Sequence, residues 1–130
     1  MTTHARGAFD VTLTPHPADP DAFLGRMTID KRFHGDLEGT SQGQMLAAQT
    51  AVQGSAGYVA IERVRGTVGG RTGTFVLQHS GLMDRGAAEL VITVVPDSGT
   101  EGLAGIRGRM TILIQGGAHS YDFAYSLPAG

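Results

Sequence analysis

The sequence predicts a single all-β domain, an eight-stranded antiparallel β-barrel whose strands follow one another in up-and-down order. The 130 residues include 20 glycines and 5 prolines, without a Gly-X-Y period. Glycine scattered among alternating apolar segments is typical of turns, bulges and bent strands. No segment between two predicted strands has room for the helix that a parallel connection requires. We therefore expect residues 1–130 to form one domain.

Two strands are predicted at the N-terminal end. Ala8–Thr14 alternates apolar and polar residues and stops at Pro15, since the residue before a proline is restricted in its backbone and proline lacks the N–H for pairing. The proline-containing segment Pro15–Leu24 is expected to be a loop with one short helical turn at Asp21–Leu24. Met27–His34 alternates again and is the second strand.

The centre of the chain contains the strongest hairpin signal. Leu37–Met45 is predicted as a strand with glycine kinks, although its continuation to Val52 also contains good helix formers. Gly57–Val68 alternates clearly and is the fourth strand. Gly69 and Gly70 then form a two-residue turn, because both can adopt positive φ. Arg71–Ser80 is the returning strand.

The last three strands complete the count of eight. Ala87–Val95 is an apolar run ended by a proline, Leu103–Ile114 follows a polar loop, and a glycine-rich turn leads into His119–Leu127. About eight strands is the number at which a closed barrel just encloses side chains or one small ligand. Closure also removes the exposed edges of an open sheet. A two-sheet sandwich is the alternative.

Composition excludes several classes of function. The net charge is -2, and no basic stretch offers a footprint for nucleic acid. The absence of cysteine excludes disulfides, thiolate nucleophiles and cysteine-held metals. The five histidines lack ligand spacing, so no metal and no cofactor are expected. No run of about 18 apolar residues and no secretory signal occurs, which predicts a soluble cytoplasmic protein with no membrane partner.

Three segments carry a resemblance to a known family. Lys31–Ser41, Gly57–Glu62 and Gly70–Gly81 resemble DUF3224, a family of small bacterial proteins of unknown function. The resemblance extends over nearly the whole chain and is most specific in the last segment. It implies a barrel similar to that of allene oxide cyclase and the dirigent proteins, and so favours the barrel over the sandwich.

The resemblance implies a lumen that holds a ligand, without an activity to assign. The plant cyclases bind an unstable fatty-acid epoxide in the barrel, steer its ring closure mainly by shape, and are trimers. Their catalytic residues have no residue-by-residue match in this sequence. The resemblance therefore implies binding of a small hydrophobic molecule, and leaves open whether the protein is an enzyme.

Three ionisable residues are candidates for acid–base catalysis. Glu38, Glu62 and His79 are predicted to project into an apolar lumen from adjacent strands, where burial raises a carboxyl pKa and an imidazole can share the proton. Such groups act as general acids or bases on an enolisable or epoxide substrate. The alternatives are ordinary: a cross-strand ion pair for Glu62, which stands beside Arg63 and Arg65, a surface or satisfied core histidine for His79, and a Glu38 that accepts backbone or hydroxyl hydrogen bonds.

Further candidates come from the aromatic and polar residues of three strands. Tyr58, Tyr121 and Tyr125 are candidate hydrogen-bond donors to a developing oxyanion. Phe75 and Gln78 complete the predicted ligand-binding set. The alternative for the tyrosines of the last strand is core packing.

Two functions remain in competition at this point. The first is a lumen that binds a small hydrophobic molecule, with the protein acting as a cyclase or isomerase through shape and general acid–base help. The second is a non-catalytic module that works as a homo-oligomer. The run Leu90–Val95 favours self-association, because a strand that is apolar on both faces needs cover outside the barrel as well.

Overall fold

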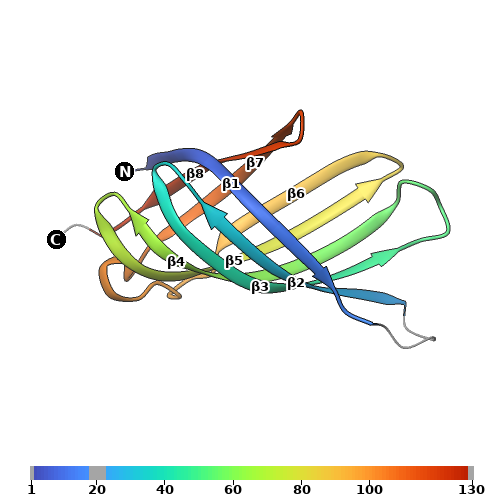
Figure 1. Cartoon of the computed structure of the whole chain (residues 1–130), viewed down its shortest axis with the longest axis horizontal. Coiled ribbons are helices and arrows are strands. Elements are labelled where there is room, and N and C mark those ends of the chain that lie inside the picture. The colour runs from blue at the N-terminus through green and yellow to red at the C-terminus, as the bar shows by residue number, and fades with distance from the viewer. Residues whose placement is uncertain (1, 18–22, 129–130) are drawn as a thin grey trace.

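The computed structural model describes residues 2–17 and 23–128 and forms a closed antiparallel barrel (Figure 1). Eight strands pair in sequence order, and the first and last strands close the barrel. The strands are β1 (Thr3–Pro15), β2 (Leu24–Phe33), β3 (Leu37–Gln49), β4 (Ala56–Val68), β5 (Arg71–Asp84), β6 (Ala87–Val94), β7 (Arg107–Gln115) and β8 (Ala118–Ser126). The prediction of an eight-stranded up-and-down barrel is confirmed. None of the described residues forms a helix that is long and apolar enough to cross a membrane.

Strand lengths differ from the prediction at three places, each for a structural reason. β1 begins at Thr3 because its first half pairs with β8, while its second half pairs with β2. β3 continues to Gln49 despite its helix formers, because Ala56 and the residues after it supply a partner strand. β7 begins only at Arg107, after a 3-10 turn at Glu101–Leu103.

The predicted loop Pro15–Leu24 lies partly outside the described residues. β1 extends to Pro15 and β2 begins at Leu24. Of the short helical turn expected at Asp21–Leu24, the first two residues fall within residues 18–22, which the structure does not describe, and Leu24 is already the first residue of β2.

The closed end of the barrel contains the aromatic core. The Phe75 and Phe123 rings stack with centroids 5.5 Å apart, and Tyr125 stacks on Phe123 at 5.3 Å. The Tyr121 hydroxyl accepts a hydrogen bond from the Leu37 amide at 2.9 Å. These side chains are buried, so this end is filled by the protein itself.

The opposite end is open, because β6 and β7 separate. They pair only through Ile92–Met110 and Thr93–Arg109, whereas β7 and β8 pair along the full length of β7. Figure 1 shows the β7–β8 hairpin diverging from β6 beyond this point. The barrel is therefore split along one side at its open end.

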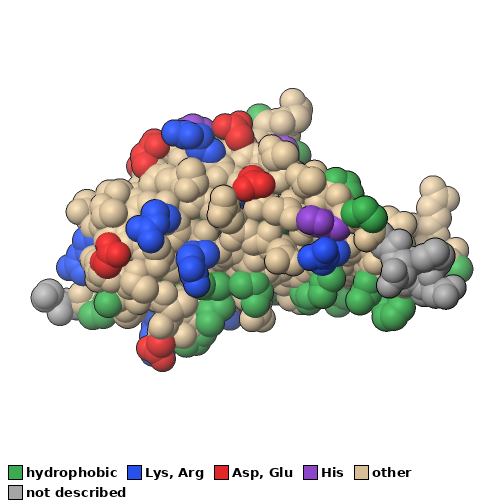
Figure 2. All heavy atoms as spheres, turned by 60° about the horizontal axis from the view of Figure 1, so that its bottom comes forward, with side chains coloured by type: hydrophobic (Ala, Val, Ile, Leu, Met, Phe, Trp, Pro, Cys, Tyr) green, Lys and Arg blue, Asp and Glu red, His purple; other side chains and the backbone are tan. Residues whose placement is uncertain are grey.

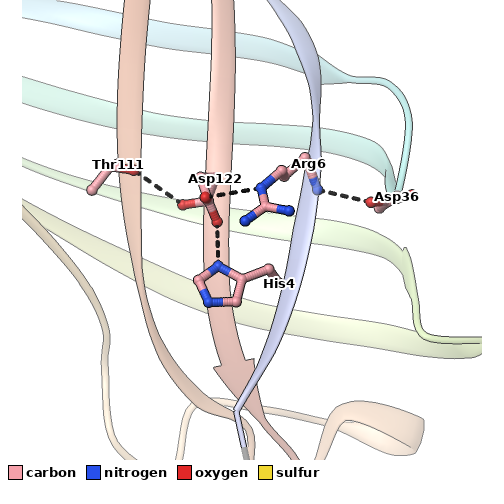
Figure 3. A network of polar contacts seen from close by, with 5 residues as sticks. All are labelled: His4, Arg6, Asp36, Thr111 and Asp122. Carbon is pink, nitrogen blue, oxygen red and sulfur yellow. Dashed lines mark hydrogen bonds and ion pairs between the residues drawn. The ribbon is translucent and has the colours of Figure 1, made fainter.

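A polar network joins the strands at the closing seam, on the outer surface (Figure 3). His4 Nδ1 lies 2.7 Å from Asp122 Oδ1, and Arg6 Nε donates to Asp122 Oδ2 at 3.0 Å. The Arg6 amide donates to Asp36 Oδ2 at 2.9 Å, and the Thr111 hydroxyl to the Asp122 carbonyl at 3.5 Å. This network ties β1 to β8, to β7 and to the β2–β3 turn.

The outer wall combines apolar and charged side chains. In Figure 2, hydrophobic side chains gather along the lower margin of the view, and charged side chains are spread over the rest of that face. Leu46 and Val59 lie opposite each other on β3 and β4 and are both exposed. Ser80 separates Val59 from the exposed Val91 of β6 in the same cross-strand row.

Candidate functional site

A single buried carboxylate organises the lumen. Glu62 lies on the inward face of β4 and is 0 % exposed. Ser41 of β3 donates to its Oε1 at 2.6 Å, and Lys31 of β2 donates to its Oε2 at 2.8 Å. His79 Nε2 of β5 contacts the same Oε2. Four consecutive strands thus direct one side chain each to this position.

The hydrogen bonds and charges around Glu62 keep it ionised. Burial alone raises a carboxyl pKa. Here the hydrogen bond from His79 and the positive charge of Lys31 outweigh burial and lower the Glu62 pKa to about 2. No fully buried polar side-chain atom of the described residues lacks a hydrogen-bond partner. The cluster is therefore a satisfied buried ion pair with a histidine attached.

Aromatic rings stabilise the buried ammonium group. Lys31 Nζ lies 5.2 Å from the centroid of the Phe9 ring and 5.8 Å from that of Phe33. The His119 ring of β8 packs against Phe9 with a centroid separation of 5.2 Å. Cations are attracted to aromatic faces at these distances, most strongly when desolvated. Lys31 is therefore held as a cation by Glu62 on one side and by two rings on the other.

The cluster borders a cavity of about 160 Å³ in the lumen. Lys31, His79, Tyr58 and His119 contribute its polar wall, while Glu62 is not part of the wall. The other lining residues are apolar: Phe9, Leu13, Ile29, Met45, Ala60, Leu90, Ile112 and Ile114. The wall of the cavity is thus formed by these four polar residues and by hydrocarbon side chains.

The two nitrogens of His79 have different surroundings. An ionised carboxylate only accepts hydrogen bonds, so His79 Nε2 carries the proton that points to Glu62. His79 Nδ1 takes part in no hydrogen bond with the described residues, and no fully buried polar atom among them is unsatisfied. Nδ1 therefore lies at the cavity surface, available to a ligand.

A second, apolar cavity of about 390 Å³ leads outward at the open end. It shares Met45, Tyr58 and Leu90 with the inner cavity. Burial, followed by the charge of Glu62, raises the pKa of Tyr58, so its hydroxyl remains a donor at neutral pH. The two cavities adjoin at the three shared residues, with the outer one on the side of the open end.

Comparison with known proteins agrees with this architecture. The profile of the family described as "Protein of unknown function (DUF3224)" matches residues 5–125. The chain belongs to the DUF3224 family. A solved structure of a DUF3224 protein of unknown function from Shewanella oneidensis MR-1 has 49% sequence identity and a TM-score of 0.93, with 100% of each chain covered. Among curated proteins, none matches this DUF3224 chain.

The structure brings two of the three predicted acid–base residues of this DUF3224 protein together. Glu62 and His79 meet in the lumen as described above. The prediction that Glu38 projects into the lumen is wrong: Glu38 is exposed and accepts a hydrogen bond from the Gly35 amide at 2.9 Å. It lies on the outer face of β3, where it supports the β2–β3 turn.

The predicted ligand-binding residues divide between three locations. Tyr58 lines both cavities. Phe75, Tyr121 and Tyr125 face the lumen but are buried in the packed closed end, away from the cavity walls. Gln78 is exposed on the outer face of β5, so its predicted position in the lumen is wrong.

Sequence reasoning missed three members of the site: Lys31, Ser41 and His119. Lys31 alternates with Ile29 and Phe33, both of which are buried. A charged residue at the apolar positions of a strand is the signal that identifies it. The cross-strand ion pair considered for Glu62 does form, with Lys31 of β2 and His79 of β5, while Arg63 lies on the outer face along a groove.

Proposed function

We propose that the lumen binds a small, largely apolar molecule and that His79 exchanges a proton with it, as in an isomerase or cyclase. The observation that carries this proposal is the Lys31–Glu62–His79 cluster at the base of an otherwise apolar cavity. Buried ion pairs add little stability compared with apolar residues of the same volume. Perturbed titratable groups beside a cavity are typical of functional sites.

The arrangement supports proton transfer next to a carbonyl group. Glu62 holds the Nε2–H of His79, which leaves the Nδ1 lone pair directed at the cavity. His79 would remove a proton from the carbon beside the carbonyl, and the Lys31 ammonium would stabilise the enolate oxygen. In a ligand with a conjugated double bond, return of that proton from His79 to the far carbon of the dienolate completes an isomerisation. In a ring closure, the enolate carbon attacks a second carbonyl carbon of the same ligand, the π bond of that carbonyl opens, and the alkoxide so formed takes the proton back from His79.

Binding is tested with a neutral apolar probe. We expect N-phenyl-1-naphthylamine to gain fluorescence in saturable fashion on wild-type protein, and Ala60→Leu to abolish the gain by filling the cavity base. Val59→Leu is the matched control, since Val59 directly precedes Ala60 on β4 and faces outward. Thermal unfolding followed by circular dichroism checks that both variants fold. Equal probe binding by Ala60→Leu and wild type would exclude the lumen as the binding site.

A self-associating module is the second candidate function, and the outer wall favours it. Leu46 and Val59 are neighbours on β3 and β4 and are 41% and 53% exposed, and Val91, 46% exposed, follows in the same cross-strand row beyond Ser80. Exposed apolar surface of this kind is typical of interaction sites. Sedimentation velocity of wild type and Val59→Glu tests it. A concentration-dependent oligomer that the substitution dissociates supports this candidate, and a monomer at all concentrations excludes it.

A further inference from the structure

We propose that the lumen ligand is an apolar monocarboxylate, bound with its carboxylate innermost on Lys31 and His79, and that His79 takes up a proton when it binds. This inference rests on the lumen binding in the proposed function, because it names the chemical class of the molecule bound there. In the carboxylate complex His79 is a cationic donor and not a base, so this complex concerns binding and not proton abstraction. Three features of the cavity carry it: the kind of polar group in the base, the unfilled hydrogen-bonding capacity there, and the charge at the rim.

The polar residues of the cavity wall are hydrogen-bond donors or cations. Lys31, His79, Tyr58 and His119 line the cavity, whereas Glu62, which contacts Lys31 and His79, does not line it. Cationic donors bind carboxylates through short, charge-assisted hydrogen bonds. An acceptor oxygen on the ligand is therefore complementary to this end, and a ligand ammonium is not.

Lys31 has hydrogen-bonding capacity to spare. An ammonium group has three donor hydrogens, and among the described residues Lys31 Nζ donates only to Glu62. Its side chain is 6% exposed and lines the inner cavity. A ligand carboxylate in that cavity would accept hydrogen bonds from the remaining ammonium hydrogens.

Charge balance requires a proton to accompany the ligand. Lys31 and Glu62 neutralise each other when His79 is neutral, so an added carboxylate would be an unbalanced buried charge, which is costly. Protonation of Nδ1 turns His79 into a second cationic donor to the ligand. Among the described residues, the groups that face His79 are Glu62 and Tyr58 from β4, Lys31 from β2 and His119 from β8. Glu62 is the one acidic group among them, and its charge is already paired with that of Lys31.

The rim of the outer cavity disfavours the reverse orientation. Of the residues that the structure describes, Glu89 is the one charged residue in the wall of the outer cavity, among apolar residues such as Leu82, Met83 and Leu90. A carboxylate left at the rim would face this like charge, whereas a hydrocarbon tail would lie against the apolar wall. The inner cavity, about 160 Å³, is smaller than a typical ligand site of about 300–1,000 Å³. The tail would therefore extend into the outer cavity.

The test is isothermal titration calorimetry with octanoate and 1-octanol, which share a tail and differ in the head. We expect octanoate to bind about ten- to a hundredfold more tightly, the range for added hydrogen bonds to charged groups. Titrations at one fixed pH in buffers of different ionisation enthalpy should show net proton uptake by the octanoate complex and none by the octanol complex.

Variants assign the effects to residues. Lys31→Met should remove the preference for octanoate, and His79→Gln should remove the proton uptake. Arg32→Met is the matched control, since Arg32 follows Lys31 on β2 and is exposed on the outer face. If Lys31→Met fails to fold, the wild-type comparison of the two heads and the His79→Gln titration still decide the question.

The outcomes separate this inference from the proposed function. Equal affinity for octanoate and octanol, or octanoate binding without proton uptake, overturns the carboxylate inference and leaves lumen binding intact. Binding of N-phenyl-1-naphthylamine without any binding of octanoate would likewise overturn the carboxylate inference and leave lumen binding intact. Failure of every probe, the neutral fluorescent one included, overturns both proposals.

Discussion

Gly43 lies directly opposite Glu62 across β3 and β4, and its missing side chain makes room for the strand that carries the carboxylate. A Cβ on Gly43 would come within 2.1 Å of the Ile61 carbonyl oxygen and 2.8 Å of Glu62 Cβ. Backbone atoms cannot move aside as the end of a flexible side chain can. The glycine therefore allows Glu62 to sit at the centre of the lumen wall, where Ser41 and Lys31 reach it.

Gly43→Ala should therefore destabilise the protein by about 1–3 kcal/mol, the usual cost of overpacking a core. Urea unfolding measures the free energy. Gly25→Ala on β2 is the matched control, because a Cβ there meets nothing closer than 3.9 Å, and alanine loses less backbone entropy than glycine. We expect Gly25→Ala to be neutral or slightly stabilising. A Gly43→Ala protein as stable as wild type would contradict the close approach.

Loss of the Glu62 charge should be more costly than loss of the whole ion pair. Glu62→Gln leaves the Lys31 ammonium buried without its counter-ion, which costs about 3–5 kcal/mol. The double variant Lys31→Met/Glu62→Gln removes both charges and should recover part of that loss, so the two effects are not additive. Urea unfolding of the single and double variants measures the coupling. Glu89→Gln, exposed at the rim, should change stability by less than about 0.5 kcal/mol.

The alternation of side chains predicted most of the fold and part of the site. Two-residue periodicity located all eight strands, and the Gly69–Gly70 turn defined the central hairpin. The start of β7 was predicted too early because Leu103 and Ile106 are apolar and resemble strand residues in the sequence. In the structure both are fully buried but precede the strand. They belong to the loop that covers the closed end, and an apolar loop residue is indistinguishable from a strand residue by composition.

The sequence contained the signals for the site, although register determines how its members meet. Glu38 shares its face of β3 with Thr40, Gln42 and Gln44, a polar alternation that is typical of an outward face and that the prediction of a lumen position for Glu38 did not use. Lys31 occupies an inward position between apolar neighbours, which indicated the reverse. The convergence of four strands on one carboxylate could not be predicted, because it depends on strand offsets that only the closed barrel determines.

Stability should fall in acid through Glu62. Its pKa is lowered from 4.5 to about 2 in the folded protein, so the unfolded chain binds a proton first as the pH falls. The stabilisation is fully present above the unfolded pKa and is lost between about pH 4.5 and pH 2; it amounts to roughly 3 kcal/mol. Urea unfolding at a series of pH values measures the slope.

Two variants identify the source of that acid dependence. Glu62→Gln should flatten the slope over this range. Asp122 also has a lowered pKa, through hydrogen bonds from His4 and Arg6 that outweigh burial, but its side chain is 35% exposed and its contribution is screened. Asp122→Asn should therefore change the slope much less. A slope that Asp122→Asn removes and Glu62→Gln preserves would place the effect at the closing seam instead of the lumen.

His79 should catalyse proton exchange at the carbon beside a carbonyl group in a ligand that fits the inner cavity. Cyclohexanone is a neutral test molecule, and NMR in deuterated water follows the loss of its exchangeable protons. We expect wild-type protein to exceed the buffer rate, and His79→Gln to remove the excess, since a positioned general base contributes about 10²–10⁴-fold. Glu62→Gln should also lower the rate, because the carboxylate no longer holds Nε2–H, while exposed His4→Gln should leave it unchanged. Equal rates for wild type and His79→Gln would assign the buried cluster to binding alone, because the same donors can hold a carbonyl oxygen without transferring a proton.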